Sequence, residues 1–112
     1  MLKLKNISDK NNISLDLICY LSSTQIIKDD IGNQIKKPIG RLVYCSEISI
    51  YSSEFFNAGQ NGIKPEHLLI IDFEEYDGET GLLYEDVRYN IYRTFPRNDG
   101  LIELYCNKKA GV

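Results

Sequence analysis

The sequence predicts a mainly β fold: a small six-stranded antiparallel β-barrel or closed sandwich, with one short helix in the long loop between the second and third strands. Stretches of alternating apolar and polar residues recur along the chain, and turn-forming Asp, Asn, Gly and Pro residues separate them at short intervals. A chain of 112 residues that is 43% apolar can bury one modest core. We therefore expect a flexible N-terminal arm, residues 1–14, followed by a single β-barrel domain, residues 15–112.

Two strands joined by a turn are predicted in the first half of the chain. Leu15–Ile27 is rich in β-branched and aromatic residues, which favour extended structure. Asp29–Asn33 reads DDIGN, in which Asp and Asn tolerate unusual backbone angles and the glycine accepts a positive φ. Pro38 and Gly40 mark the start of a second strand, Arg41–Tyr51, whose side chains alternate between two faces.

The segment SSEFFNAGQNGIKPE, Ser52–Glu66, interrupts the strand pattern and predicts a helix of about two turns, which is marginal in isolation. One of its first two serines can cap the helix, and Glu54 suits the positive N-terminal end. Phe55 and Phe56 are adjacent, so they cannot both face inward from the helix. We expect one of them to pack on the barrel core and the other to be left for a partner. The alternative is that both cover an open end of the barrel.

Four more strands are predicted after this connection. The most apolar, Glu66–Tyr76, is expected at the centre of the sheet. Asp77–Glu79 contains an Asp-Gly pair, a strong signal for a tight hairpin turn. Leu82–Glu85 predicts a short strand, and Val87–Phe95 alternates between two faces. The last strand is Leu101–Lys109, in which alternate apolar side chains are expected to point together.

An arginine interrupts an otherwise apolar face of the fifth predicted strand. Five side chains at alternate positions are expected to share this face: Val87, Tyr89, Ile91, Arg93 and Phe95. The guanidinium can lie at a barrel end, where it reaches solvent or stacks on an aromatic ring. It can also pair with an acid of its own chain or of a neighbouring copy.

The chain lacks the residue patterns of a catalytic or metal site. His67 is the only histidine and is expected at the surface or at a strand edge. Glu74 and Glu75 are adjacent on a predicted strand, so they point to opposite faces and cannot act on one substrate together. We expect no enzyme activity, no metal and no cofactor. Three cysteines, spaced far apart in apolar stretches, are expected to be reduced, half-buried core residues: Cys19, Cys45 and Cys106.

Charge is unevenly distributed along the chain, whose net charge is −3. Basic residues dominate residues 1–41, whereas residues 66–86 hold eight acids and no Lys or Arg. The acidic segment is either a solvated strand face or a surface that meets the basic part of a neighbouring copy. Net negative charge disfavours tight binding to nucleic acid. No apolar run approaches the length of about 20 residues that spans a membrane.

A set of short motifs in a fixed order resembles the head-closure, or head–tail joining, proteins of long-tailed bacteriophages, also called connector or stopper proteins. The most specific motifs of the set are Ser53-Glu54-Phe55-Phe56 with Ala58-Gly59, Lys64-Pro65-Glu66, Tyr76-Asp77-Gly78-Glu79, Tyr89-x-Ile91-x-Arg93-Thr94 and Glu103-Leu104. The resemblance covers residues 15–112 and leaves the N-terminal arm without a counterpart.

The resemblance implies a structural virion protein in the neck of the particle, assembled in the host cytoplasm. Such a protein forms a ring of six or twelve copies under the portal and adaptor, closes the DNA exit channel of the filled capsid, and docks the tail or a tail-completion protein. Packaged DNA passes through without specific binding, and no membrane is involved. In this family the long connection, which is residues 52–64 here, is poorly ordered in the free monomer and takes shape in the ring.

Two groups of candidate site residues follow from this interpretation. The assembly and channel loop comprises Ser53, Glu54, Phe55, Phe56, Asn57, Gln60, Asn61 and Lys64. The secondary interface candidates are Asp29, Asp30, Asn33, Asp77, Glu79 and Arg93. Two alternatives remain open: an adaptor or tail-completion ring protein of the same neck, and a barrel of the oligonucleotide-binding type that stacks single-stranded nucleic acid on its aromatic residues.

Overall fold

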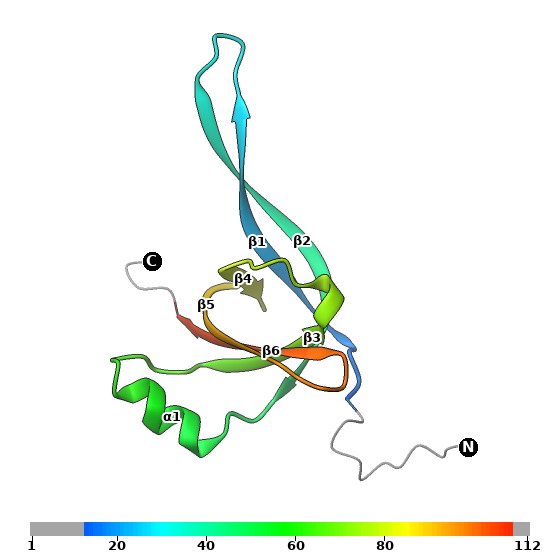
Figure 1. Ribbon diagram of the computed structural model, residues 1–112, viewed down its shortest axis with the longest axis vertical. Coiled ribbons are helices and arrows are strands. Elements are labelled where there is room, and N and C mark those ends of the chain that lie inside the picture. Colours follow the sequence, from blue (N-terminus) through cyan, green and yellow to red (C-terminus); the bar gives the residue numbers. More distant parts are fainter. Residues whose placement is uncertain (1–12, 109–112) are drawn as a thin grey trace, which may run out of the picture.

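The computed structural model forms a closed antiparallel barrel with the strand order β1-β2-β3-β6-β5-β4 (Figure 1). It describes residues 13–108, without the side chains of residues 24–27 and 35–38. The elements are β1 (Leu17–Lys28), β2 (Gln34–Ile48), α1 (Ser52–Gly59), β3 (His67–Asp72), a 3₁₀ turn η1 (Phe73–Glu75), β4 (Gly81–Tyr84), β5 (Val87–Pro96) and β6 (Leu101–Lys108). The predicted fold class is confirmed. All but the last two residues of the predicted N-terminal arm lie outside the described residues.

The barrel interior is filled by alternate side chains from all six strands. The most deeply buried members of this core are Cys19, Leu21, Val43, Cys45, Leu69, Ile71, Leu82, Ile102, Leu104 and Cys106. All three cysteines are free thiols and are fully buried, rather than half-buried as predicted. Burial raises the pKa of the Cys106 thiol to about 12, so it stays protonated and unreactive. The cysteines therefore act as core residues.

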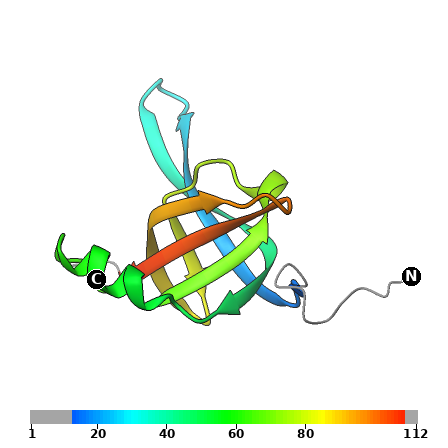
Figure 2. The ribbon, with the colours of Figure 1, turned by 60° about the horizontal axis from the view of Figure 1, so that its bottom comes forward.

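β2 is longer at its start than the sequence predicts. It begins at Gln34 rather than Arg41, and Pro38 pairs with Thr24 in a long β1–β2 ribbon. β2 pairs with β3 only from Cys45 onward, so the outer part of the ribbon has no third strand and projects from the barrel (Figures 1 and 2). Proline is tolerated there because one edge of the strand has no neighbour to bond. β2 ends at Ile48 instead of Tyr51.

β3 is the central apolar strand that was predicted, but it is shorter than Glu66–Tyr76. Its residues Leu68–Ile71 are all fully buried, because one face lines the interior and the other lies on the side of the barrel that carries α1. After Asp72 the chain turns into η1, where the Asp72 carboxylate accepts a hydrogen bond from the Glu74 N–H at 2.9 Å. The predicted strand ends there.

The predicted Asp-Gly hairpin is wrong. Gly78 does have a positive φ of 86°, but β3 and β4 are not neighbours in the barrel, so this turn lies in a crossover between distant strands. The two-residue hairpin turn lies at Glu85 and Asp86, which join β4 to β5 with φ values of 51° and 66°. A turn with positive φ at both positions matches the twist of the two strands.

A β-bulge in β5 overturns the predicted common face of that strand. Ile91 pairs with Cys106, whereas Arg93 pairs with Tyr105, so Tyr92 is an extra residue between them. One inserted residue reverses the side-chain alternation. Beyond the bulge, Arg93 and Phe95 no longer point into the barrel. Arg93 instead faces outward beside Tyr105.

Candidate assembly surface around helix α1

Helix α1 lies outside the barrel wall, on the side of β3 and β6 (Figures 1 and 2). It starts directly after Tyr51, which occupies the N-cap position without a side-chain hydrogen bond. The predicted serine cap is wrong, because Ser52 is already the first helical residue and cannot accept from the next turn as a cap does. The helix ends at Gly59, and the Ile63 N–H donates a hydrogen bond to the Ala58 carbonyl at 3.0 Å.

Glu54 fixes the helix to the barrel. It is 5% exposed, and its carboxylate accepts hydrogen bonds from the Tyr92 hydroxyl at 2.7 Å and from Arg93 Nη2 at 2.5 Å. Arg93 also lies over the Tyr105 ring, 4.0 Å from its centroid. The bulge allows two consecutive residues of β5 to reach the same carboxylate. Of the two interpretations of Arg93, pairing with an acid of its own chain is the one observed, and stacking on an aromatic ring accompanies it.

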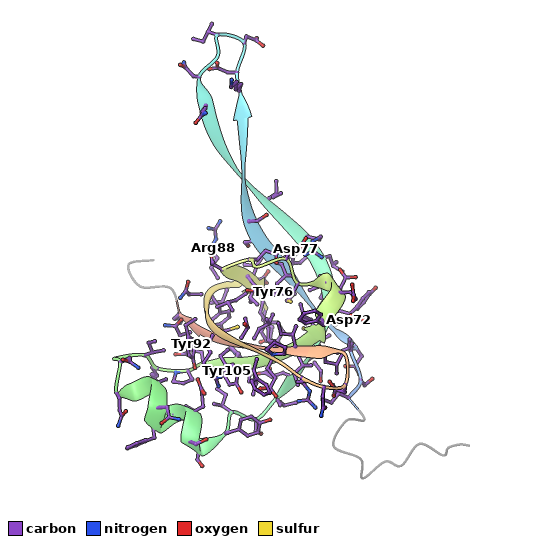
Figure 3. The ribbon with its side chains drawn as sticks, in the orientation of Figure 1. Asp72, Tyr76, Asp77, Arg88, Tyr92 and Tyr105 are labelled. Carbon is purple, nitrogen blue, oxygen red and sulfur yellow. The ribbon has the colours of Figure 1, made fainter. Side chains whose placement is uncertain are left out.

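A second buried carboxylate continues this polar network under α1. Glu103 is 4% exposed and accepts from the Tyr105 hydroxyl at 2.6 Å and from Arg97 Nη1 at 3.0 Å. The Tyr51 hydroxyl, directly before α1, donates to the same carboxylate at 3.4 Å. Figure 3 shows Tyr92 and Tyr105 on the side of the barrel that faces α1. The helix is thus held at its start and through its first turn.

The two phenylalanines do not divide between core and partner as predicted. Phe55 is 47% exposed and Phe56 is 68% exposed, and the buried residues of α1 are Glu54 and Ala58. These two positions are four apart and lie on one face of the helix, so this face, and not a phenylalanine, meets the barrel. Both phenylalanines are left on the exposed side of the helix. We call this pair the Phe ridge.

The other predicted loop residues lie on α1 and in the segment that follows it. Ser53, Asn57, Gln60, Asn61 and Lys64 are all exposed. A groove of about 490 Å³ separates α1 from β5, and it is lined in part by Ser53, Asn57 and Asn61. The predicted loop residues are thus exposed on α1 and the segment after it, three of them beside the groove, while Glu54 is the buried anchor among them.

The secondary interface candidates lie apart from that surface. Asp29, Asp30 and Asn33 are at the tip of the β1–β2 ribbon, where the Asp29 carboxylate accepts from the N–H groups of Ile31 and Asn33 and holds the turn. Asp77 is exposed in the crossover on the far side of the barrel (Figure 3). Arg93 alone joins the α1 surface, through Glu54.

Glu79 is buried and pairs with Arg41 inside the same chain. Arg41 Nη2 lies 2.8 Å from the Glu79 carboxylate, and Arg41 Nη1 lies 2.8 Å from that of Glu75. The acidic segment is therefore partly neutralised by the basic half of its own chain. Glu79 acts in folding rather than as an interface residue.

A second exposed apolar surface was not predicted as a site. Ile18 and Tyr20 of β1 lie opposite Tyr44 and Leu42 of β2 on the outer wall, and all four are more than one-third exposed. We call these four residues the outer strip. The strip continues across β1 to Leu83 of β4, which pairs with Tyr20. The alternation of side chains along β2 could have revealed this surface in the sequence. Both faces of β2 are apolar there, however, so the alternation does not show which face lies outside.

A groove of about 340 Å³ runs between β1 and β4 at the edge of the outer strip. We call it the β1–β4 groove; its lining is Leu17, Ile18, Tyr20, Leu83, Tyr84, Glu85 and Asp86. The hydrocarbon and aromatic side chains form its walls, and the two acids of the β4–β5 turn stand exposed at its rim. Contiguous exposed apolar surface of this kind commonly marks an interaction site.

His67 is mostly covered rather than at the surface or at a strand edge. Its Nδ1 lies 2.5 Å from the Glu47 carboxylate and its Nε2 lies 3.0 Å from the Tyr89 hydroxyl. The Tyr84 hydroxyl donates to the other Glu47 oxygen at 2.9 Å. Both ring nitrogens thus have partners, and the cluster connects β2, β3, β4 and β5. Within residues 13–108, no three His, Cys, Asp or Glu side chains gather as a metal site would require.

Glu54, which anchors α1 to the barrel, has a lowered pKa, so acid titration measures the strength of this contact. Burial by itself would raise the pKa of Glu54, but the hydrogen bonds from Arg93 and Tyr92 and the charge of Arg93 outweigh it and hold the pKa below its ordinary value of 4.5. The pKa of Glu79 is also lowered, because hydrogen bonds from backbone N–H groups and from Arg41 outweigh its burial. The pKa of Asp99 is lowered in the same way by hydrogen bonds from Arg97 and from backbone N–H groups.

We predict that the protein loses stability as acid protonates these three carboxylates. A carboxyl group whose pKa is lower in the folded state stabilises the fold fully above its ordinary pKa, and this contribution is lost as pH falls through the folded-state pKa. Urea unfolding over a series from neutral to strongly acid pH measures the loss. Glu54→Gln is expected to flatten the acid limb, and an unchanged limb would show that Glu54 is not anchored as described.

Comparison with known proteins gives a likeness in fold alone. No protein-family model and no curated protein matches the chain. The solution structure of protein SF1141 from Shigella flexneri 2a superposes with a TM-score of 0.71, covering 91% of this chain and 99% of that chain at 14% sequence identity. Among the described residues, no helix has the length and apolar character needed to cross a membrane.

Proposed function

We propose that this chain is a structural virion protein of the head-closure type, which forms a ring under the portal and adaptor of a tailed phage, closes the DNA exit channel and docks the tail. The observation that carries the proposal is the pair of unlike exposed apolar surfaces, the Phe ridge and the outer strip with its groove, on one small barrel. The motif set described above points to the same class.

The two surfaces lie on opposite walls of the barrel. In the closed order β1-β2-β3-β6-β5-β4, the β3–β6 pair lies across the barrel from the β4–β1 pair. α1 stands outside β3 and β6, whereas the groove lies between β4 and β1. Subunits of a ring contact each other through two different surfaces, one on each side, whereas a two-fold dimer uses one surface twice. Unlike surfaces on opposite walls suit a ring.

The projecting ribbon also suits an assembled state. Its outer part has no third strand, and an isolated two-stranded ribbon is only marginally stable in water. Ile31 at its tip is 81% exposed. Contacts with neighbouring copies, with the portal or adaptor above, or with the tail below would stabilise the ribbon.

The proposal is tested by assembly with the neighbouring neck proteins. The free protein is expected to be a monomer or a weak oligomer, and rings are expected on portals that carry the adaptor, as seen by electron microscopy. Light scattering that shows a tight dimer, insensitive to salt, as the only species would contradict a ring. An adaptor or tail-completion protein of the same neck would use the same surfaces, and the position of the ring in the neck distinguishes these roles.

Nucleic-acid binding is expected to be negligible at physiological salt. The outer strip has aromatic residues, as a stacking platform for single strands would, but its groove is edged by Glu85 and Asp86 rather than by basic residues. A chain of net charge −3 neutralises few phosphates. Fluorescence anisotropy with labelled single-stranded DNA measures this. Salt-dependent binding at low micromolar protein would favour the nucleic-acid alternative.

The Phe ridge is expected to matter for assembly and not for folding. Phe55→Ser and Phe56→Ser, alone or together, should leave the melting temperature nearly unchanged, because both side chains are exposed. Loss of an aromatic hot spot typically costs about 2 kcal/mol of binding, or roughly thirty-fold in affinity. Phe73→Ser is the matched control, since Phe73 is 47% exposed but lies in η1. A ridge variant that still forms rings and completes virions would overturn the role given to α1.

A further inference from the structure

We propose that the Phe ridge of one copy seats in the β1–β4 groove of the next copy, with Lys64 of the first facing Glu85 and Asp86 of the second. This inference deepens the proposed function and rests on it for the existence of a ring. The new element is the pair of surfaces through which neighbouring subunits contact each other.

The first support is the match in chemistry between the two surfaces. The walls of the β1–β4 groove are apolar and aromatic, from Leu17 and Ile18 through to Leu83. Phe56 is the most exposed aromatic side chain on α1, and Phe55 stands beside it. Burial of adjacent aromatic side chains in an apolar groove is the usual source of binding energy at protein interfaces. The groove beside α1 does not offer such a place, because Glu54 and Arg93 line it and already satisfy each other.

The second support is charge complementarity. From Ser52 to Lys64 the single exposed charged side chain is Lys64, since Glu54 is buried and paired with Arg93. Glu85 and Asp86 are exposed at the groove rim and form no ion pair within residues 13–108. Lys64, which follows α1 in the chain, can therefore pair with two acids that have no ion-pair partner among the described residues, and this favours the pairing.

The third support is the backbone conformation at the rim. Both Glu85 and Asp86 have a positive φ, where Asn and Gly are the favoured residues of such a turn. Residues held in sparsely populated backbone conformations cluster at functional sites. The turn holds both acids exposed at the rim of the groove, where a partner can reach their carboxylates.

The occupant of the β1–β4 groove must come from a second copy of the chain. The ridge and the groove lie on opposite walls of the same barrel, so they cannot meet within one chain. A ridge-to-ridge dimer would leave both apolar grooves empty and the acids at their rims without a cation. A contact between the ridge of one copy and the groove of the next can repeat from copy to copy. Such a chain of contacts closes into a ring when the rotation between neighbouring copies allows it.

Charge reversal tests the pairing. Lys64→Glu, and separately Glu85→Lys with Asp86→Lys, are expected to weaken self-association by about tenfold, because each places like charges at the contact. The three changes combined in one chain are expected to restore association. Lys108→Glu, an exposed lysine at the end of β6, is the control and should have no effect. Sedimentation over a concentration series, with and without the portal and adaptor, measures association, and circular dichroism verifies the fold. Failure of the combined variant to recover would overturn the pairing.

Photo-crosslinking locates the contact independently. A benzophenone analogue of phenylalanine at position 56 is placed in isotopically light protein, which is mixed with heavy protein and assembled on the adaptor-bearing portal. We expect light-to-heavy crosslinks to the peptides that contain Ile18 or Leu83. Crosslinks elsewhere in rings that still form would overturn this pairing and leave the proposed function intact. Crosslinks in the groove of assemblies that never join the portal would support the pairing and overturn the head-closure role. No association under any condition would overturn both.

Discussion

Replacement of Tyr105 with alanine is expected to lower the free energy of unfolding by about 3–5 kcal/mol, as for other buried aromatic residues. The side chain is 2% exposed, on the face of β6 that lies towards α1. Its ring lies under the Arg93 guanidinium, and its hydroxyl donates to Glu103. The substitution therefore opens a cavity and removes a contact from each of the two groups that hold α1.

Tyr105→Phe separates the ring from the hydroxyl. This variant keeps the packing and the contact with Arg93, and loses one hydrogen bond to a buried carboxylate, so we expect a cost of about 1–3 kcal/mol. Burial, first, and the hydrogen bond to Glu103, second, raise the pKa of the Tyr105 hydroxyl, which stays a donor at neutral pH. Urea unfolding followed by circular dichroism measures both variants. Equal losses for Ala and Phe would show that the ring does not support the α1 side of the barrel.

Replacement of Arg93 with alanine is expected to cost about 2 kcal/mol of stability and to release α1 from the barrel. Removal of one partner from a buried ion pair costs about 3–5 kcal/mol, and the value is lower here because solvent reaches the guanidinium. Glu54 would be left buried with the Tyr92 hydroxyl as its remaining side-chain donor. A helix of eight residues is unstable without tertiary contacts, so the α1 amides should exchange with solvent faster than those of the barrel.

Arg88→Ala is the matched control for Arg93→Ala. Arg88 is an exposed arginine of the same strand and forms no ion pair in the described part of the chain, and it lies at the opposite side of the barrel from α1 (Figure 3). A double-mutant cycle with Glu54→Ala isolates the coupling between the two anchor residues. The cost of the double variant should be well below the sum of the single costs. Additive costs, with α1 amides still protected in Arg93→Ala, would refute the anchor.

The strands were predictable because each carries a local signal. Period-two alternation and β-branched content mark β1, β4, β5 and β6, and the unbroken apolar run of β3 marks a strand buried on both faces. The turn at Asp29–Asn33, with its positive φ at Gly32, follows from residue type and short spacing. These features depend on residues a few positions apart, so the sequence alone determined them, as it did the six-stranded class.

The features that define the candidate site depend on contacts between distant residues, and only the tertiary structure decided them. The bulge at Tyr92 exists because of how β5 registers on β6, and it turns Arg93 from the predicted interior face towards Glu54, 39 residues away. The docked face of α1 follows from that ion pair, so both phenylalanines remain outside. The outer strip was hidden because apolar residues occupy both faces of β2, and only closure of the barrel selects which face is buried. Local sequence patterns encode the period of a strand, but which of its faces becomes the interior is set by its partners.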